Sequence, residues 1–76
     1  MKTVTLYSRP GCHLCDEARA ALERIRADQP FRLQEIDIES DDALLKRYLE
    51  RLPVIALEGA ELFDHFVDEQ ALRRKL

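Results

Sequence analysis

The chain has 76 residues, with 12 Lys and Arg against 15 Asp and Glu, a net charge of −3 and 46% hydrophobic residues. A folded chain of this length buries only roughly 60% of the surface that its unfolded form exposes, so we expect a single domain over residues 1–76 with its chemistry at the surface. The hydrophobic fraction is too high for a disordered tail, no apolar run is long enough to span a bilayer, and the basic residues are scattered among acids. We therefore expect a soluble protein that binds neither a membrane nor nucleic acid.

Lys2 leads directly into an alternating stretch without the apolar core of a secretory signal, so we expect a cytoplasmic protein. The two cysteines, Cys12 and Cys15, are three positions apart and would close a loop too small to tether distant parts of a fold. We therefore expect them to serve chemistry or metal binding rather than to hold the domain together.

Residues 2–7 alternate polar and apolar side chains, and the turn-forming residues 8–11 interrupt them, which predicts a strand and its exit loop. The apolar spacing then becomes helical from residue 12 to about residue 28. Asp16 and Glu17 lie in the first turn of this predicted helix, where acidic side chains stabilise the helix dipole.

A second strand is predicted over residues 31–38. Its apolar residues change phase, because Phe31 and Leu33 point to one face and Ile36 and Ile38 to the other. We therefore expect a bulge or a pairing that starts late. The acidic residues around the strand end are expected to be solvated or to cap the next helix: Glu35, Asp37, Glu39, Asp41 and Asp42.

A second helix is predicted over residues 42–50, because Ser40 or Asp41 can cap it and apolar residues follow with helical spacing. The side chains expected to face inward are Leu45, Tyr48, Leu49 and Leu52. Residues 54–57 then form a short apolar strand.

The rest of the chain predicts a return strand over residues 60–66, after a turn at Glu58-Gly59, and a last helix that Asp68 caps. The initial strand, helix and strand imply a parallel pair with a right-handed crossover. The expected fold class is therefore α/β, in the order βαβαββα, with one four-stranded mixed sheet flanked by helices.

The residues Cys12-His13-Leu14-Cys15 form a C-x-x-C motif where a strand exit loop meets a helix start. Unpaired backbone N–H groups and the positive end of the helix dipole stabilise an anion there, which favours the thiolate of Cys12. We expect Cys12 to attack and Cys15, one helical turn later, to resolve the mixed disulfide. Arg9 and a protonated His13 would add to the stabilisation of the thiolate.

Two other interpretations of the motif stay open. The same dithiol suits a carrier of a soft metal ion or of an iron–sulfur cluster. A redox-inert binding module that happens to keep both cysteines is a further alternative. His65 would complete a zinc site only if it approached the cysteines, and we expect it at a strand end instead, so no metal ligand is assigned.

Thr5-Leu6-Tyr7-Ser8-Arg9-Pro10-Gly11-Cys12-His13-Leu14-Cys15 resembles the glutaredoxin signature, in which a strand leads through a basic residue to C-x-x-C. Leu52-Pro53-Val54 resembles the segment around the cis-proline of the thioredoxin superfamily, and Glu58-Gly59 matches a turn of that fold. The resemblance covers essentially the whole chain and is closest to small bacterial glutaredoxin-like proteins. It implies a thioredoxin-like, glutaredoxin-type fold and a monomeric dithiol-disulfide oxidoreductase in cell redox homeostasis.

By this resemblance the Leu52-Pro53 bond is cis and lies beside Cys12, and the backbone of Leu52 pairs with an extended thiol substrate. Arg9 matches a contact to a carboxylate of glutathione. The full set of expected substrate-binding residues is Arg9, His13, Leu14, Leu52 and Pro53. The implied partners are protein thiols and disulfides or glutathione as a co-substrate, with no bound cofactor.

The sequence also departs from its relatives. Thioredoxins carry a Trp directly before the first cysteine and a buried acid six residues before it, where this chain has Gly11 and Leu6. Glutaredoxins that bind glutathione carry a Gly-Gly pair after the fourth strand, and this chain has bulkier residues over positions 63–67. Close approach of glutathione to the backbone is therefore disfavoured, although Asp68 still opens the last helix.

Overall fold

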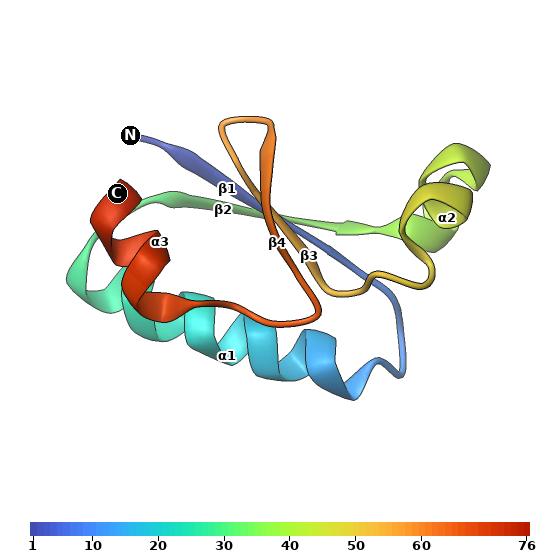
Figure 1. The fold of residues 1–76 in the computed structure, drawn as a ribbon, viewed down its shortest axis with the longest axis horizontal. Coiled ribbons are helices and arrows are strands. Elements are labelled where there is room, and N and C mark those ends of the chain that lie inside the picture. Colours follow the sequence, from blue (N-terminus) through green and yellow to red (C-terminus); the bar gives the residue numbers. More distant parts are fainter.

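The structure, a computed structural model, describes residues 1–76 (Figure 1). Its elements confirm the predicted βαβαββα order, and most of their ends lie within one or two residues of the predicted ones. A short 3-10 helix before the second α-helix was not predicted. The elements are β1 (Thr3–Ser8), α1 (His13–Asp28), β2 (Arg32–Asp37), η1 (Ile38–Ser40), α2 (Asp42–Tyr48), β3 (Val54–Leu57), β4 (Ala60–Asp64) and α3 (Glu69–Lys75).

The four strands form one mixed sheet in the order β2-β1-β3-β4. Strand β1 runs parallel to β2 and antiparallel to β3, and β3 runs antiparallel to β4. Figure 1 shows α1 and α3 together on one side of the sheet and α2 beyond one end of it. None of these helices combines the length and the apolar composition that crossing a membrane requires.

Two hydrophobic clusters hold these layers together. The larger one lies between the sheet and the pair α1 and α3, and its buried members are Val4, Leu6, Ala18, Leu22, Ile25, Phe31, Ile55 and Leu72. The smaller one joins the start of α1 to η1, α2 and β3, through Cys15, Ile38, Tyr48, Leu52 and Val54. Because Cys15 belongs to the smaller cluster, the packing of α2 and β3 bears directly on the cysteine pair.

The bulge expected in β2 is wrong, because β2 pairs with β1 in unbroken register from Thr3↔Arg32 to Ser8↔Asp37. The pairing starts one residue after the predicted start of the strand. The change of phase has another cause. Phe31 and Leu33 pack in the larger cluster, whereas Ile38, just after the strand, packs in the smaller one. The strand thus contributes to apolar clusters on both faces of the sheet, which requires no extra residue.

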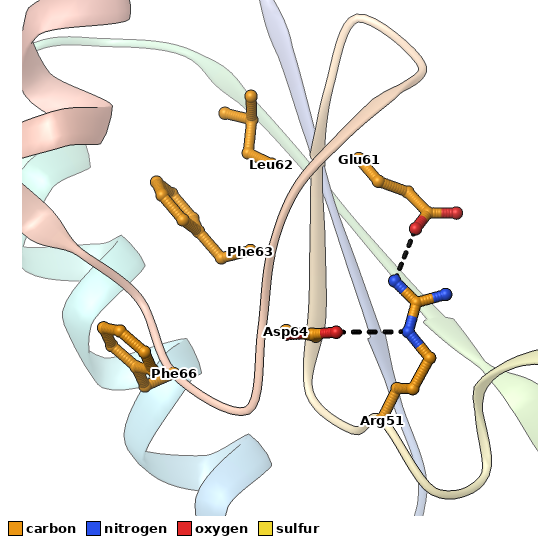
Figure 2. Close-up of a pocket in the computed structure, with 6 residues that line it drawn as sticks. All are labelled: Arg51, Glu61, Leu62, Phe63, Asp64 and Phe66. Carbon is orange, nitrogen blue, oxygen red and sulfur yellow. Dashed lines mark hydrogen bonds and ion pairs between the residues drawn. The ribbon is translucent and has the colours of Figure 1, made fainter.

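The sheet has its irregularity in β4, where the register shifts between Ile55 and Ala56. Ile55 pairs with Phe63 and Ala56 pairs with Glu61, so Leu62 is the extra residue. Figure 2 shows Leu62 and Phe63 on the side of the helices and Glu61 on the other side. A bulge therefore lets two consecutive apolar residues pack against the same cluster.

Helix α2 begins where the sequence predicts, because the Asp41 carboxylate accepts hydrogen bonds from the N–H groups of Ala43 at 2.8 Å and Leu44 at 3.4 Å. Its predicted inward face needs one correction. Leu49 is 43% exposed, and Leu44 packs against the smaller cluster instead. Helical spacing puts Leu49 at the edge of the apolar face that is centred on Leu44 and Tyr48.

The hairpin between β3 and β4 turns at Glu58 and Gly59, whose φ angles are 50° and 84°. Two consecutive positive φ angles suit the two-residue turns that follow the twist of a hairpin. Strand β4 then ends at Asp64, two residues earlier than predicted, which leaves Phe66 outside the sheet. The Asp68 carboxylate caps α3 by accepting a hydrogen bond from the N–H of Ala71 at 3.1 Å.

We predict that Leu22→Ala lowers the free energy of unfolding by about 2–5 kcal/mol, because Leu22 is fully buried between α1 and the sheet. The matched control is Leu49→Ala, which removes the same atoms from an exposed site and should cost about 0.5 kcal/mol or less. Urea denaturation of both variants measures the difference. Equal losses would contradict the assignment of the core.

Candidate functional site

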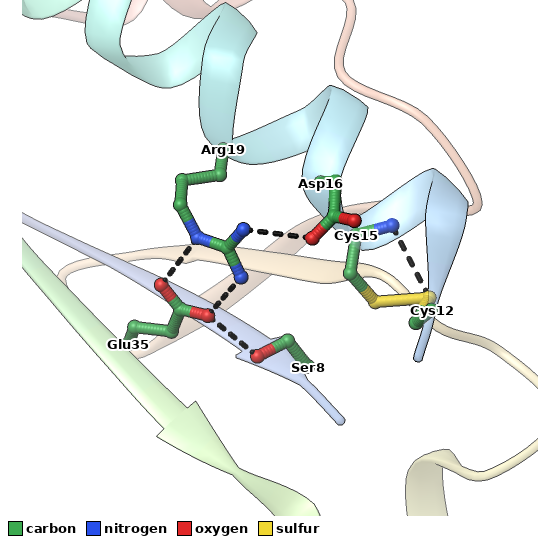
Figure 3. A network of polar contacts seen from close by, with 6 residues as sticks. All are labelled: Ser8, Cys12, Cys15, Asp16, Arg19 and Glu35. Atoms are coloured by element: carbon green, nitrogen blue, oxygen red, sulfur yellow. Dashed lines mark hydrogen bonds and ion pairs between the residues drawn. A yellow bond between two sulfur atoms is a disulfide. The ribbon is translucent and has the colours of Figure 1, made fainter. Parts of the chain in front are cut away.

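The cysteine pair lies where the loop after β1 enters α1. Cys12 is the N-cap of α1, with φ −90° and ψ 106°, and its Sγ accepts a hydrogen bond from the N–H of Cys15 at 3.2 Å. Gly11, with a φ of 78°, turns the chain into the helix in a conformation that favours glycine. The Cα atoms of the two cysteines are 5.2 Å apart, and their sulfur atoms are joined as a disulfide (Figure 3).

The two sulfur atoms differ in exposure. Cys15 is fully buried in the smaller cluster, whereas Cys12 is only partly buried and lies at its border. A molecule that approaches from solvent therefore reaches Cys12 first. At the N-cap, the sulfur of Cys12 also lies at the end of the helix that carries unpaired N–H groups, which stabilise negative charge.

The segment before β3 lies next to the cysteines. The Leu52-Pro53 peptide bond is cis, as the resemblance to the thioredoxin superfamily implied. Val54 directly after it pairs with Tyr7 at the end of β1, and Leu52 packs in the same cluster as Cys15. The carbonyl of Pro53 accepts a hydrogen bond from His65 at 2.8 Å, while the N–H and C=O of Leu52 have no partner within the chain.

The other three expected substrate-binding residues lie at different places on the surface: Arg9, His13 and Leu14. Arg9 lies 3.1 Å from a carboxylate oxygen of Glu39, and both side chains are partly exposed. The His13 side chain is 84% exposed and lies 3.4 Å from Glu17, so it points into solvent. Leu14 is 47% exposed on another side of α1. The structure thus brings Leu52, next to Pro53 in the chain, into one cluster with Cys15, and the other three residues lie outside that cluster.

A polar network that the sequence did not predict lies beside the disulfide (Figure 3). The guanidinium of Arg19 binds both carboxylate oxygens of Glu35 and donates to Asp16 at 2.8 Å, and Ser8 donates to Glu35 at 2.8 Å. Hydrogen bonds from Arg19 lower the pKa of Glu35, against the opposing effect of burial, and the carboxylates raise the pKa of Arg19. Glu35 is therefore a paired carboxylate and not a fully solvated one.

This network depends on the register between β1 and β2, which the sequence did not indicate. Leu6 pairs with Glu35, so the two residues share the face of the sheet that α1 covers. Arg19 lies on α1 above that face. The network borders a polar pocket of about 250 Å³, lined by Ser8, Arg9, Pro10, Gly11, Asp16, Arg19, Glu35 and Asp37.

A family model described as "Glutaredoxin-like domain (DUF836)" matches residues 3–76, almost the whole chain. The chain belongs to the glutaredoxin-like domain family. A relative from Dictyostelium discoideum, named a glutaredoxin-like protein, is 30% identical over 77 residues, which cover 91% of this chain and 69% of the relative. The family resemblance predicted from the sequence is therefore confirmed.

Solved structures confirm the predicted thioredoxin-like fold. The solution structure of protein Ne2328 from Nitrosomonas europaea matches with a TM-score of 0.86 and 32% identity, over 99% of this chain and 91% of that one. Oxidized mitochondrial thioredoxin 3 from Saccharomyces cerevisiae matches with a TM-score of 0.72 over 97% of this chain and 74% of that one. At 16% identity this second match shows the fold alone. Together with the cysteine pair, the family and the fold support a redox function.

This glutaredoxin-like domain lacks the glycine pair of glutathione-binding glutaredoxins, yet the backbone there keeps an unusual conformation. His65, directly after β4, has a φ of 72°, in the left-handed region that favours glycine. Its N–H donates to the carbonyl of Pro53, which fixes the segment after β4 beside the cis-proline. A histidine side chain thus stands where a glycine would leave the backbone open.

We predict that Glu35→Gln lowers the free energy of unfolding by less than about 1 kcal/mol at neutral pH, because the pair with Arg19 is partly exposed. The lowered pKa of Glu35 means that its contribution is present above the unfolded pKa of about 4.3 and is lost as the pH falls through the lowered value. Urea denaturation at about pH 7 and about pH 2.5 should show a difference that shrinks in acid.

The control for this measurement is Glu50→Gln, at an exposed position after α2 that forms no ion pair. It should change stability little at either pH. A loss for Glu35→Gln that is equally large in acid would show that the carboxylate charge has no part in the stabilisation.

Proposed function

We propose that the protein is a dithiol-disulfide oxidoreductase that exchanges its Cys12-Cys15 disulfide with protein or low-molecular-weight thiols. The observation that carries the proposal is the asymmetry of the pair. Cys12 is reachable at the N-cap of α1, and Cys15 is buried one turn later, within bonding distance. This is the arrangement that a two-step exchange requires.

In the reductive direction, the thiolate of Cys12 attacks one sulfur of a substrate disulfide and forms a mixed disulfide, and the other substrate sulfur leaves as a thiolate. Cys15 then loses its proton to solvent and attacks the sulfur of Cys12. The substrate's second sulfur leaves as a thiolate, and the Cys12-Cys15 disulfide forms. Two electrons pass from the dithiol to the substrate, and an external thiol must return them in the reverse sequence.

The helix start supports the role of Cys12. The hydrogen bond from the N–H of Cys15 and the dipole of a 16-residue helix stabilise the thiolate of Cys12 relative to the disulfide. Because the thiolate belongs to the reduced form, this stabilisation makes the disulfide a stronger oxidant. The acidic side chain of Asp16 in the first turn opposes this effect, but it is paired with Arg19.

The cis-proline segment supports substrate binding. Leu52 offers a free N–H and a free C=O next to Cys15, and an extended peptide can pair with such groups as an added strand. Pro53 has no N–H of its own, so it leaves no unpaired donor beside the sulfur atoms. In this proposal Leu52 and Pro53 orient the substrate, while Arg9, His13 and Leu14 border the entrance.

The metal or iron–sulfur carrier stays a prediction as the alternative. No group of three or more His, Cys, Asp or Glu side chains is arranged to hold a metal ion. A metal bound by Cys12 and Cys15 would therefore take its other ligands from a second protein molecule or from a small thiol. The expectations of glutathione as a co-substrate, of a monomer and of a cytoplasmic role in redox homeostasis likewise stay predictions.

We predict opposite effects for the two cysteine variants. With Cys15→Ser, Cys12 still attacks but cannot be released, so a mixed disulfide with the substrate accumulates. With Cys12→Ser, the rate of exchange falls about 100-fold or more, because the remaining sulfur is buried. Intact-mass analysis after mixing each reduced variant with 2-hydroxyethyl disulfide distinguishes the two. Accumulation of the mixed disulfide on Cys12→Ser would reverse the proposed roles.

A further inference from the structure

A groove runs along α1 and is closed on its other side by the segment that joins β4 to α3. Its volume is about 190 Å³. The apolar part of its lining consists of Leu14, Ala18, Ala21, Phe66 and Val67, which we call the apolar groove. Pockets for whole small-molecule ligands are usually about 300 Å³ or larger, so this groove suits one or two side chains of a larger partner.

The apolar groove gathers apolar surface that the fold does not cover. Four large apolar side chains are well exposed in this chain, and two of them, Phe66 at 65% and Leu14 at 47%, line this one groove. Single exposed apolar residues are ordinary, whereas exposed apolar side chains that gather in one groove favour a contact with another molecule. Figure 2 shows the ring of Phe66 beside α1, away from the polar side of β4.

The apolar groove adjoins the C-x-x-C segment through Leu14, and neither cysteine lines it. Leu14 lies between the two cysteines in the sequence, so one wall of the groove belongs to the redox-active turn. The other wall is fixed to the cis-proline segment, because the N–H of His65 donates to Pro53. A substrate sulfur bonded to Cys12 holds residues one or two positions away within about 7 Å in an extended chain. The groove wall begins at Leu14, only two positions after Cys12 in the chain.

The charges around the site favour an apolar occupant over a small acidic thiol. Three arginines border the apolar groove and the polar pocket, and each already has a carboxylate partner: Arg9 with Glu39 at 3.1 Å, Arg19 with Asp16 at 2.8 Å and Arg24 with Glu69 at 2.8 Å. A thiol that carries carboxylates, such as glutathione, must compete with these partners. An apolar side chain gains from burial without such competition.

Provided that the chain is the oxidoreductase proposed above, we infer that its substrates are proteins whose reactive cysteine has an apolar residue one or two positions away. The apolar groove takes that side chain, and Phe66 is the residue that determines the preference. Covering the exposed part of Phe66 and burying a leucine side chain correspond to a rate advantage of about fivefold over a polar residue, which is about 1 kcal/mol.

The test uses mixed disulfides of two short peptides that differ only next to the cysteine, one with leucine and one with serine on both sides. The reduced protein should react about fivefold faster with the leucine peptide. Phe66→Ser should reduce that ratio to near one, and Phe66→Leu should keep most of it. Leu49→Ser, which removes an exposed leucine from α2, is the matched control and should leave the ratio unchanged.

Two further substrates separate the failure of this inference from the failure of the proposed function. The protein could reduce 2-hydroxyethyl disulfide but reduce the two peptide disulfides at equal rates, or it could prefer oxidised glutathione to the leucine peptide. In either case the apolar groove has no role, and the proposed oxidoreductase function stands. A preference that survives Phe66→Ser also overturns the inference. If the unaltered protein reduces none of these disulfides faster than the Cys12→Ser variant does, the proposed function itself is wrong.

Discussion

The position of Cys12 at the N-cap of α1 is the constraint on which the rest of the site depends. The parallel pair β1 and β2 requires a crossover helix, and the start of that helix lies at the end of β1, beside the end of the sheet where β3 begins. The cis Leu52-Pro53 segment therefore arrives next to the cysteines through ordinary sheet pairing. The same packing buries Cys15 against α2 and β3 and leaves only one sulfur accessible. The fold and the reactivity of Cys12 therefore both depend on the connection between β1 and α1.

The surroundings of the disulfide differ from one side to the other. On one side, polar residues from β1, α1 and β2 form a closed set of hydrogen bonds around Glu35 and Arg19. On the other, the segment after β4 presents Phe66 to α1 across the apolar groove. In a glutaredoxin that binds glutathione, the glycine pair leaves this second side open to the tripeptide. Here His65 keeps a glycine-like backbone, and Phe66 and Val67 after it line the apolar groove, so the same fold offers a different contact surface.

Much of this could be predicted from the sequence, because local chemistry determines it. The element order, the Asp41 and Asp68 caps and the placement of the C-x-x-C at a helix start follow from periodicity and capping residues. What could not be predicted depends on pairing between distant segments. Glu35 meets Arg19 only because the register sets it opposite Leu6, and the bulge in β4 exists only because Leu62 and Phe63 share one cluster. The exposure of Leu49 and of Phe66 likewise depends on where α2 and β4 end.

The most direct test of the central claim is the dithiol-disulfide equilibrium of Cys12 and Cys15 in graded glutathione redox buffers, read by mass after rapid alkylation. Metal content is determined on the same protein, both as isolated and after purification without metal. An oxidoreductase should show a reversible two-electron transition between about −270 and −120 mV, with no stoichiometric metal. An as-isolated protein that carries stoichiometric metal or a cluster and forms no intramolecular disulfide would contradict the proposed function, and the carrier would take the place of the oxidoreductase.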